Sequence, residues 1–262
     1  MSAEVPVRVE RDGDVAMIVL DDPPLNLFTE RTFSALVEAR DEVAASDARA
    51  MVFRAEGKVF TAGVDVKKVF ADVPGSEEGT RLAAAGVRDL QAIEALEIPT
   101  LALVHGLCLT AGLEASLGCD LIWAAEGSRF GLVERVVGLT PFGGGVQRMA
   151  ERAGPARARE FVMTGELYGA ETMLEWGVLN RVLPADALLE EGMELAHTLA
   201  AGPTIAHGAT KRLVRAYLDG GIAAADDATA GIAGPLFDTD DLKGAVRSFI
   251  EDGPGKATYE GR

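Results

Sequence analysis

The sequence has few residues of the types that bind metals or form disulfide frameworks. Its 262 residues include only two cysteines, Cys108 and Cys119, and three histidines, His105, His197 and His207. Two cysteines form no disulfide framework, so reduced thiols and a cytoplasmic location are expected. Because the histidines are far apart and lack metal-ligand spacing, a metal site is not expected.

Positive charge is also scarce. The chain has 25 Lys and Arg against 41 Asp and Glu, which gives a formal net charge of −16. Nucleic acids and anionic membranes require a positively charged surface, so neither partner is expected. The chain also lacks an apolar run long enough to cross a membrane, and its first residues contain no apolar signal region.

The hydrophobic content of 48% is sufficient for a large core. Asp12-Gly13 lies between the apolar runs 5–10 and 15–20, a pattern that predicts a β-hairpin. Further strands are expected at 50–54, 100–104, 120–124 and 178–183. These strands and the helical patterns between them predict an α/β core over 1–200, followed by an all-helical region over 201–262.

Several helix boundaries are also readable. Thr29 is expected to cap the helix that follows it, and a second helix is expected at 81–96. Beyond residue 186 the predicted helices cover 187–201, 204–218, 222–233 and a last segment after Thr239. This last segment has an apolar stripe that needs a partner, formed by Leu242, Val246, Phe249 and Ile250.

One carboxylate is isolated in the most apolar part of the chain. Between residues 98 and 119, Glu114 is the only acidic residue and there is no Lys or Arg. Thr110 is expected to cap the short helix that carries it. An ionised carboxylate in apolar surroundings costs several kcal/mol, so Glu114 is expected to be neutralised, paired or functional. The alternative is a solvated glutamate favoured by the dipole at the start of a helix.

A glycine cluster follows this region. Gly143, Gly144 and Gly145 precede a predicted helix at 146–153, where their backbone N–H groups could bind an anion.

Five segments together resemble the crotonase, or enoyl-CoA hydratase/isomerase, superfamily. They occur in the expected order over nearly the whole chain. The segments are PPLNLFTERTFSAL (23–36), GKVFTAGVDVKKV (57–69), VHGLCLTAGLEASLGCDLIWA (104–124), SRFGLVERVVGLTPFGGGVQRM (128–149) and DLKGAVRSFIEDGPGKATY (241–259).

The resemblance implies a fold, an assembly and a ligand. The fold would be a spiral of repeated ββα units with a C-terminal helical region that packs between subunits. The assembly would be a homotrimer or a hexamer built as a dimer of trimers. The ligand would be an acyl-CoA thioester substrate, with no cofactor apart from the coenzyme A of the substrate.

The resemblance also assigns an oxyanion hole. The backbone N–H groups of Val64 and Ala111 would hold the thioester oxygen, where negative charge develops when an enolate forms. Lys67 and Lys68 could reach the CoA phosphates. The expected substrate-binding residues are Ala62, Asp65, Val66, Lys67, Gly112 and Phe142.

Two glutamates match the catalytic pair of family hydratases. The resemblance implies that Glu114 and Glu134 hold a water molecule, that Glu114 takes its proton, and that Glu134 protonates the α-carbon. Two neighbouring carboxyls in one pocket cannot both ionise without a large energetic cost, so one is expected to retain a proton near neutral pH. The alternative for Glu134 is an ion pair with Arg135 or Arg148.

The chain departs from the family pattern at two places. Thr110 and Ala111 stand where hydratases usually have glycines, so a Cβ lies beside the oxyanion amide. Phe142 replaces a usual glycine and is expected to narrow the acyl pocket.

The sequence also offers features of other enzyme classes. Ser116, His105 and Asp120 cluster in sequence as in a serine hydrolase, but no G-x-S-x-G surrounds Ser116. The glycine cluster lacks both nucleotide-binding signatures. The remaining alternatives are a Δ3,Δ2-enoyl-CoA isomerase, which needs only one carboxylate, and a non-catalytic acyl-CoA binding protein.

Overall fold

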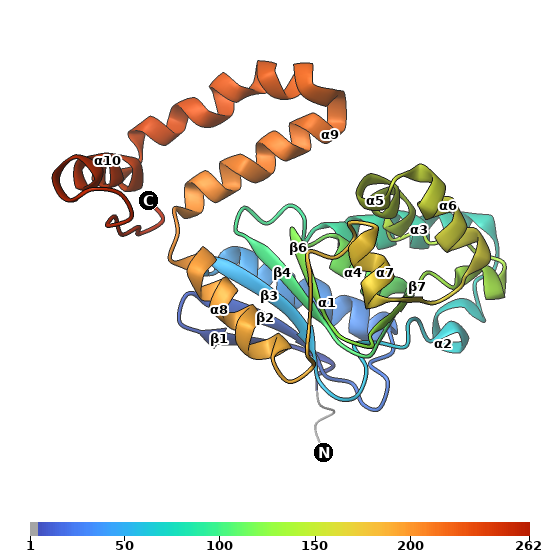
Figure 1. The fold of residues 1–262 in the computed structure, drawn as a ribbon. Coiled ribbons are helices and arrows are strands. Elements are labelled where there is room, and N and C mark those ends of the chain that lie inside the picture. Colours follow the sequence, from blue (N-terminus) through green and yellow to red (C-terminus); the bar gives the residue numbers. More distant parts are fainter. Residues whose placement is uncertain (1–4) are drawn as a thin grey trace.

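A computed structural model describes residues 5–262, so the first four residues of the predicted core lie outside the described part. Six strands form the main sheet, in the order β1-β2-β3-β4-β6-β9 (Figure 1). Only the β1–β2 pair is antiparallel, which confirms the predicted hairpin. The strands are β1 (Val7–Asp12), β2 (Val15–Leu20), β3 (Ala50–Ala55), β4 (Thr100–Val104), β6 (Leu121–Ala125) and β9 (Arg181–Leu183).

A smaller sheet leads directly into the helix that carries Glu114. It contains β5 (Leu107–Leu109), β7 (Arg129–Gly131) and β8 (Tyr168–Gly169), which the sequence did not predict. The strands have only two or three residues, too few for a recognisable period. The isolated bridges Phe28–Val64 and Thr61–Cys108 connect two loops to this region.

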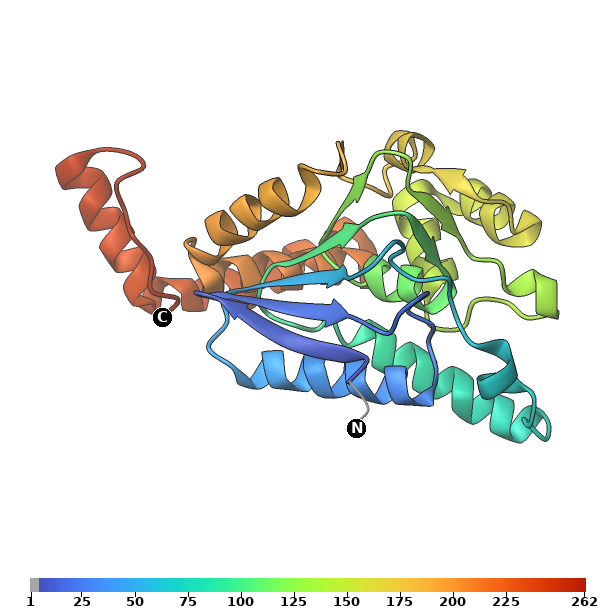
Figure 2. The same cartoon turned by 90° about the horizontal axis from the view of Figure 1, so that it is seen from below.

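The main sheet is buried on both faces because successive side chains alternate between them. Ala16, Ile18 and Leu20 of β2 pack into the larger core, whereas Val15 packs on the opposite side. The helix α1 (Glu30–Ala45) lies on one face and α8 (Leu188–Ala200) on the other (Figure 2).

The remaining helices lie around the carboxyl ends of the strands, and the short helices α2 and η1 among them were not predicted. Thr29 accepts a hydrogen bond from Thr32 N, which confirms its capping role for α1. The helix predicted at 81–96 is α3, which spans Ser76–Gln91 and so begins and ends earlier than predicted. These helices are α2 (Val66–Phe70), α3 (Ser76–Gln91), α4 (Thr110–Leu117), η1 (Glu134–Val137), α5 (Gly145–Ala153), α6 (Pro155–Thr164) and α7 (Ala170–Glu175).

The C-terminal region projects from the core as a helical arm (Figure 1). It comprises α9 (Thr204–Ala233), η2 (Gly234–Asp238) and α10 (Asp240–Asp252). The two predicted helices at 204–218 and 222–233 form one element with a kink at Gly221, where the backbone is not helical. Within residues 5–262, none of the helices is long and apolar enough to cross a membrane.

Asn26 ties the loop after β2 to the loop after β3. Its side chain is 3% exposed, and Nδ2 donates to the carbonyl oxygens of Glu56, Val59 and Phe60 at 2.9–3.1 Å. Its Oδ1 accepts from Asp22 N at 2.8 Å. A φ of 49° at Asn26 suits asparagine, which tolerates the left-handed region better than most residues. The side chain therefore substitutes for backbone pairing between two loops.

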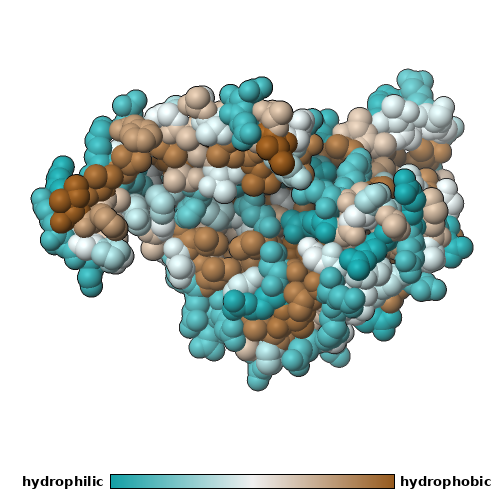
Figure 3. Space-filling view, turned by 45° about the horizontal axis from the view of Figure 1, so that its top comes forward, coloured by the Kyte–Doolittle hydropathy of each residue, from teal (hydrophilic) through white to brown (hydrophobic). Residues whose placement is uncertain are grey.

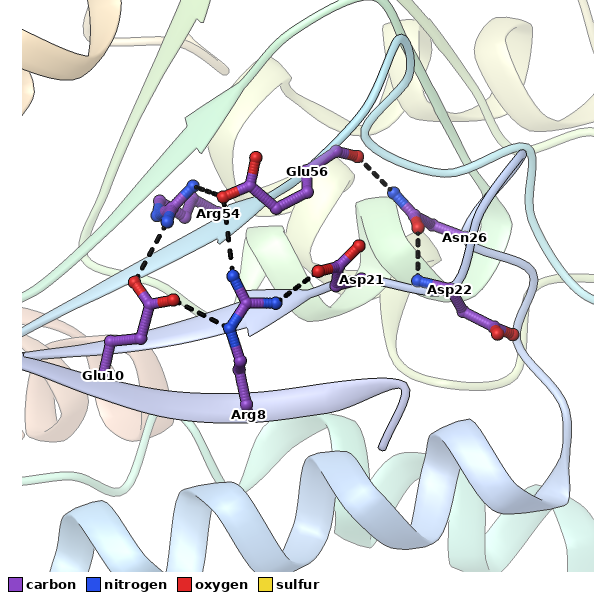
Figure 4. Close-up of polar contacts among 7 residues, drawn as sticks. All are labelled: Arg8, Glu10, Asp21, Asp22, Asn26, Arg54 and Glu56. Carbon is purple, nitrogen blue, oxygen red and sulfur yellow. Dashed lines mark hydrogen bonds and ion pairs between the residues drawn. The ribbon is translucent and has the colours of Figure 1, made fainter. Parts of the chain in front are cut away.

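A cluster of charged side chains lies beside Asn26 on the first three strands (Figure 4). Arg8 pairs with Glu10 at 2.7 Å and with Asp21 at 2.5 Å, and Arg54 pairs with Glu10 and Glu56. Because most of these side chains are partly exposed, solvent screening reduces the contribution of each pair.

These two neighbouring features should differ in their effect on stability. Asn26→Ala is expected to lower the free energy of unfolding by about 2–3 kcal/mol, because it leaves buried carbonyl groups without partners. Arg8→Met should cost about 1 kcal/mol or less. Urea unfolding followed by circular dichroism would measure both. Equal losses in the two variants would contradict the role assigned to Asn26.

Candidate active site

A cavity of about 470 Å³ lies between α1, α3, α4 and η1. Its wall is largely apolar, with Phe33, Phe70 and Phe142 among the lining residues. Glu114 and Glu134 both line it, although they are 20 residues apart in sequence and come from different elements. The cavity therefore brings together the two carboxyl groups that the sequence analysis singled out.

Glu114 is held in a defined orientation by backbone N–H groups. It lies on α4 and is 4% exposed. Its Oε1 accepts from Gly143 N at 2.8 Å and from Gly145 N at 2.9 Å. Burial raises the pKa of Glu114, and these two N–H groups and the charge of Arg148 oppose that rise. The anion expected at the glycine cluster is thus the carboxylate of the chain itself.

The glycine loop can approach Glu114 because it has no side chains. A Cβ on Gly143 would lie 2.8 Å from Glu114 Oε2, and a Cβ on Gly145 would lie 2.8 Å from Glu114 Cγ. Behind the loop, Gln91 Nε2 donates to the Gly143 carbonyl, and Arg148 forms an ion pair with Glu94. Gln91 and Glu94 were not predicted from the sequence, because their partners Gly143 and Arg148 are 52 and 54 residues away.

Glu134 occupies the first position of η1 and is half-buried. Burial, followed by the negative charge of Glu114, raises the pKa of Glu134 to about 8. Its Oε2 is buried and has no hydrogen-bond partner within residues 5–262. Arg148 pairs with Glu94 and Arg135 donates to the Thr164 carbonyl. Among residues 5–262, therefore, neither arginine forms the alternative ion pair with Glu134.

The two predicted oxyanion residues lie on the same cavity. Val64 and Ala111 both line it. Ala111 is the second residue of α4, where a helical N–H group has no acceptor within its own helix. Val64 N donates to the Thr110 hydroxyl at 3.1 Å. Thr110 therefore does not cap α4 as predicted, because its hydroxyl is engaged with another loop; the residue preceding the helix is Leu109.

The other predicted substrate-binding residues fall into two groups. Ala62, Val66 and Phe142 line the cavity, and the ring of Phe142 lies 6.0 Å from that of Phe70. The cavity wall described for residues 5–262 does not include Asp65, Lys67 or Gly112. Asp65 caps α2, Lys67 is exposed, and Gly112 packs where a side chain would meet Thr61 and Phe28.

Neither competing catalytic arrangement is assembled. Ser116 donates to the Gly112 carbonyl at 2.8 Å, whereas Asp120 pairs with Lys211 and His105 contacts the Gly57 carbonyl. These three side chains are engaged separately and form no triad. Across the described residues, no group of three or more His, Cys, Asp or Glu could hold a metal ion.

Known proteins share this architecture. Residues 10–262 match the family model described as enoyl-CoA hydratase/isomerase. Over 215 residues the chain is 34% identical to a carnitinyl-CoA dehydratase of Salmonella heidelberg, with 80% of each chain covered.

Solved structures extend the similarity to the fold. An enoyl-CoA hydratase of Mycobacterium smegmatis matches with a TM-score of 0.88 and 28% identity, over 95% of this chain and 97% of that one. An enoyl-CoA hydratase subunit I of Geobacillus kaustophilus matches with a TM-score of 0.91 and 29% identity, over 98% and 99% of the two chains. The predicted crotonase-like α/β fold with a C-terminal helical region is confirmed, and the chain belongs to the enoyl-CoA hydratase/isomerase family of the crotonase superfamily.

Proposed function

We propose that the protein is a hydro-lyase that adds water to 2-trans-enoyl-CoA thioesters. The observation that carries this proposal is the pair of carboxyl groups in one apolar cavity. Glu114 is held by two N–H groups, whereas Oε2 of Glu134 is buried with no hydrogen-bond partner within residues 5–262. Hydration needs one group to take a proton from water and another to give a proton to carbon. The different surroundings of Glu114 and Glu134 support such a division.

The roles follow from the protonation of the pair. With a pKa raised to about 8, Glu134 retains its proton near neutral pH and acts as the acid toward the α-carbon. Burial raises the pKa of Glu114 as well, but the two N–H hydrogen bonds on Oε1 and the charge of Arg148 oppose that rise, so the base role is assigned to Glu114. As Glu114 takes a proton from water, the hydroxyl adds to the β-carbon. The oxyanion site meanwhile stabilises the enolate formed from the thioester.

The lining of the cavity and one relative bear on the acyl group of the substrate. A relative at 34% identity is named carnitinyl-CoA dehydratase, and dehydration is the reverse of the hydration proposed here. The aromatic wall of Phe33, Phe70 and Phe142 favours a short or apolar acyl chain, because Phe142 reduces the space beside Gly86. Isomerisation of 3-enoyl-CoA remains the second candidate, since Glu134 alone could move that proton. The cytoplasmic location stays a prediction.

Glutamine substitutions should separate these activities. Glu114→Gln and Glu134→Gln keep side-chain size and remove titration, so each should lower hydration roughly a hundredfold to ten-thousandfold. Loss of absorbance of the enoyl thioester, measured under saturating substrate, would report the rate. Glu134→Gln should depress isomerisation as well, whereas Glu114→Gln should spare most of it. Wild-type hydration by either folded variant would disprove the two-glutamate mechanism.

The raised pKa of Glu134 predicts an alkaline limit to activity. The active state of the pair carries one proton, which is lost as pH rises through about 8. Therefore kcat/KM for hydration should be level below about pH 7, should be halved near pH 8 and should fall by about tenfold per pH unit well above it. Initial rates between pH 6 and 10 would test this, with stability checked at each pH. A level profile up to pH 10 would contradict the assignment of Glu134 as the acid.

The helical arm supports a further part of the proposal, assembly as a homotrimer or hexamer. Figure 3 shows apolar surface along the projecting arm, whose exposed residues include Phe237, Phe249 and Ile250. A monomer would leave these side chains in water, which is unfavourable for a cluster of this kind.

Light scattering should therefore give the mass of three or six chains. Phe249→Glu should shift the protein toward smaller species, because it places a charge in the buried contact. Leu189→Glu on α8, which substitutes another exposed apolar residue, is the control and should not change the mass. An active wild-type monomer would contradict the proposed assembly.

A further inference from the structure

Thr110 has an unusual backbone conformation at the entrance to α4. Its φ is 47°, and Asn26 is the only other non-glycine residue with positive φ among residues 5–262. Branched side chains rarely adopt this left-handed conformation, which favours glycine. Thr110 is nevertheless 7% exposed and lines the cavity beside Glu114. The site thus retains a strained threonine where glycine would fit without strain.

The hydroxyl of Thr110 is hydrogen-bonded to Val64 N, one of the two predicted oxyanion donors. Val64 N donates to Thr110 Oγ1 at 3.1 Å, so this N–H group already has an acceptor inside the protein. The approach depends on Gly63, where an added Cβ would lie 2.6 Å from Thr110 Oγ1. Gly63 also has a φ of 99°, so a side chain there would be strained as well.

The hydroxyl retains a hydrogen that it can donate. A threonine hydroxyl has one donor hydrogen and two acceptor positions, and Val64 N occupies one of the acceptor positions. Within residues 5–262 the Thr110 hydroxyl accepts this hydrogen bond and donates none. Since Thr110 lines the cavity, a thioester oxygen bound there could accept it.

We propose that the Thr110 hydroxyl donates directly to the thioester oxygen, with Val64 N–H acting behind it. This assignment rests on the proposed function. In it the Thr110 hydroxyl takes the place of Val64 N–H as direct donor, and Val64 N–H donates to the hydroxyl oxygen. Ala111 N–H would remain the second direct donor. No proton is transferred, because the hydroxyl only rotates to donate while its oxygen continues to accept from Val64 N.

Such a chain of hydrogen bonds suits the developing enolate. A hydroxyl that accepts one hydrogen bond becomes a better donor, because successive hydrogen bonds polarise one another. In a low-dielectric cavity a donor aimed at the developing charge is far more effective than in water. Thr110 would therefore be a catalytic residue in direct contact with the substrate.

Three substitutions at Thr110 test this role through hydration kinetics. Thr110→Val keeps the shape but removes the hydroxyl and blocks Val64 N–H, so kcat should fall by about a hundredfold to a thousandfold. Thr110→Ser keeps the hydroxyl and should retain roughly a tenth or more of kcat. Thr110→Gly exposes Val64 N–H to the substrate and should therefore be more active than Thr110→Val.

The controls address folding and obstruction. Thr198→Val on α8 removes an exposed hydroxyl far from the cavity and should leave kcat unchanged. Thermal melts should show that Thr110→Val is folded and that Thr110→Gly melts at a higher temperature than wild type, because the strain is removed. Wild-type kcat in folded Thr110→Val would overturn the proposal. A rise above wild type in both Thr110→Val and Thr110→Gly would show instead that the hydroxyl obstructs the site.

A second measurement separates this proposal from the proposed function. Infrared difference spectra of a saturated acyl-CoA, ¹³C-labelled at the thioester carbonyl, report hydrogen bonding without turnover. Binding to wild type should lower the carbonyl frequency, and Thr110→Val should return it toward the value in solution. If wild type binds the thioester and lowers this frequency but hydrates no enoyl-CoA, hydration is wrong while the Thr110 assignment stands. An equal shift in wild type and Thr110→Val would overturn the Thr110 assignment alone.

Discussion

The site depends on keeping two carboxyl groups inside one apolar cavity. Each would lose much of its solvation there, and their charges repel if both ionise. The structure provides different surroundings for the two: backbone N–H groups bind Glu114, whereas Glu134 Oε2 has no partner in the described part of the chain. The proposed division into one base and one acid near neutral pH rests on this asymmetry.

The residues around Glu114 produce the difference between the two carboxyl groups. The glycines at 143 and 145 allow their N–H groups to reach Glu114, and Gln91 contacts the carbonyl of Gly143 from behind. Arg148 contributes a positive charge near Glu114, but its ion pair is with Glu94, so Glu114 remains available to the cavity. A charge on Glu114 is therefore stabilised by N–H groups of the glycine loop, and Arg148 forms its ion pair with Glu94 and not with Glu114.

The side of the cavity with Val64 and Ala111 also depends on contacts between distant segments. Loops from distant parts of the chain meet there through the Phe28–Val64 and Thr61–Cys108 bridges, and Asn26 braces one of these loops. Thr110 links the two predicted donor loops through its hydroxyl. A close approach of this kind requires small residues, so substitutions in this region affect geometry as well as chemistry.

The sequence by itself determined the α/β class, the hairpin, the central strands and the C-terminal helices, because these depend on local periodicity and capping. The ordered motifs also identified Glu114, Glu134, Val64 and Ala111 as candidates. Only the tertiary structure decided which groups meet. The binding of Glu114 by Gly143 and Gly145, and the contact of Val64 N with Thr110, join residues 29–46 positions apart. Short strands such as β5 exist because neighbouring chain segments pair with them, and propensity within three residues cannot encode such pairing.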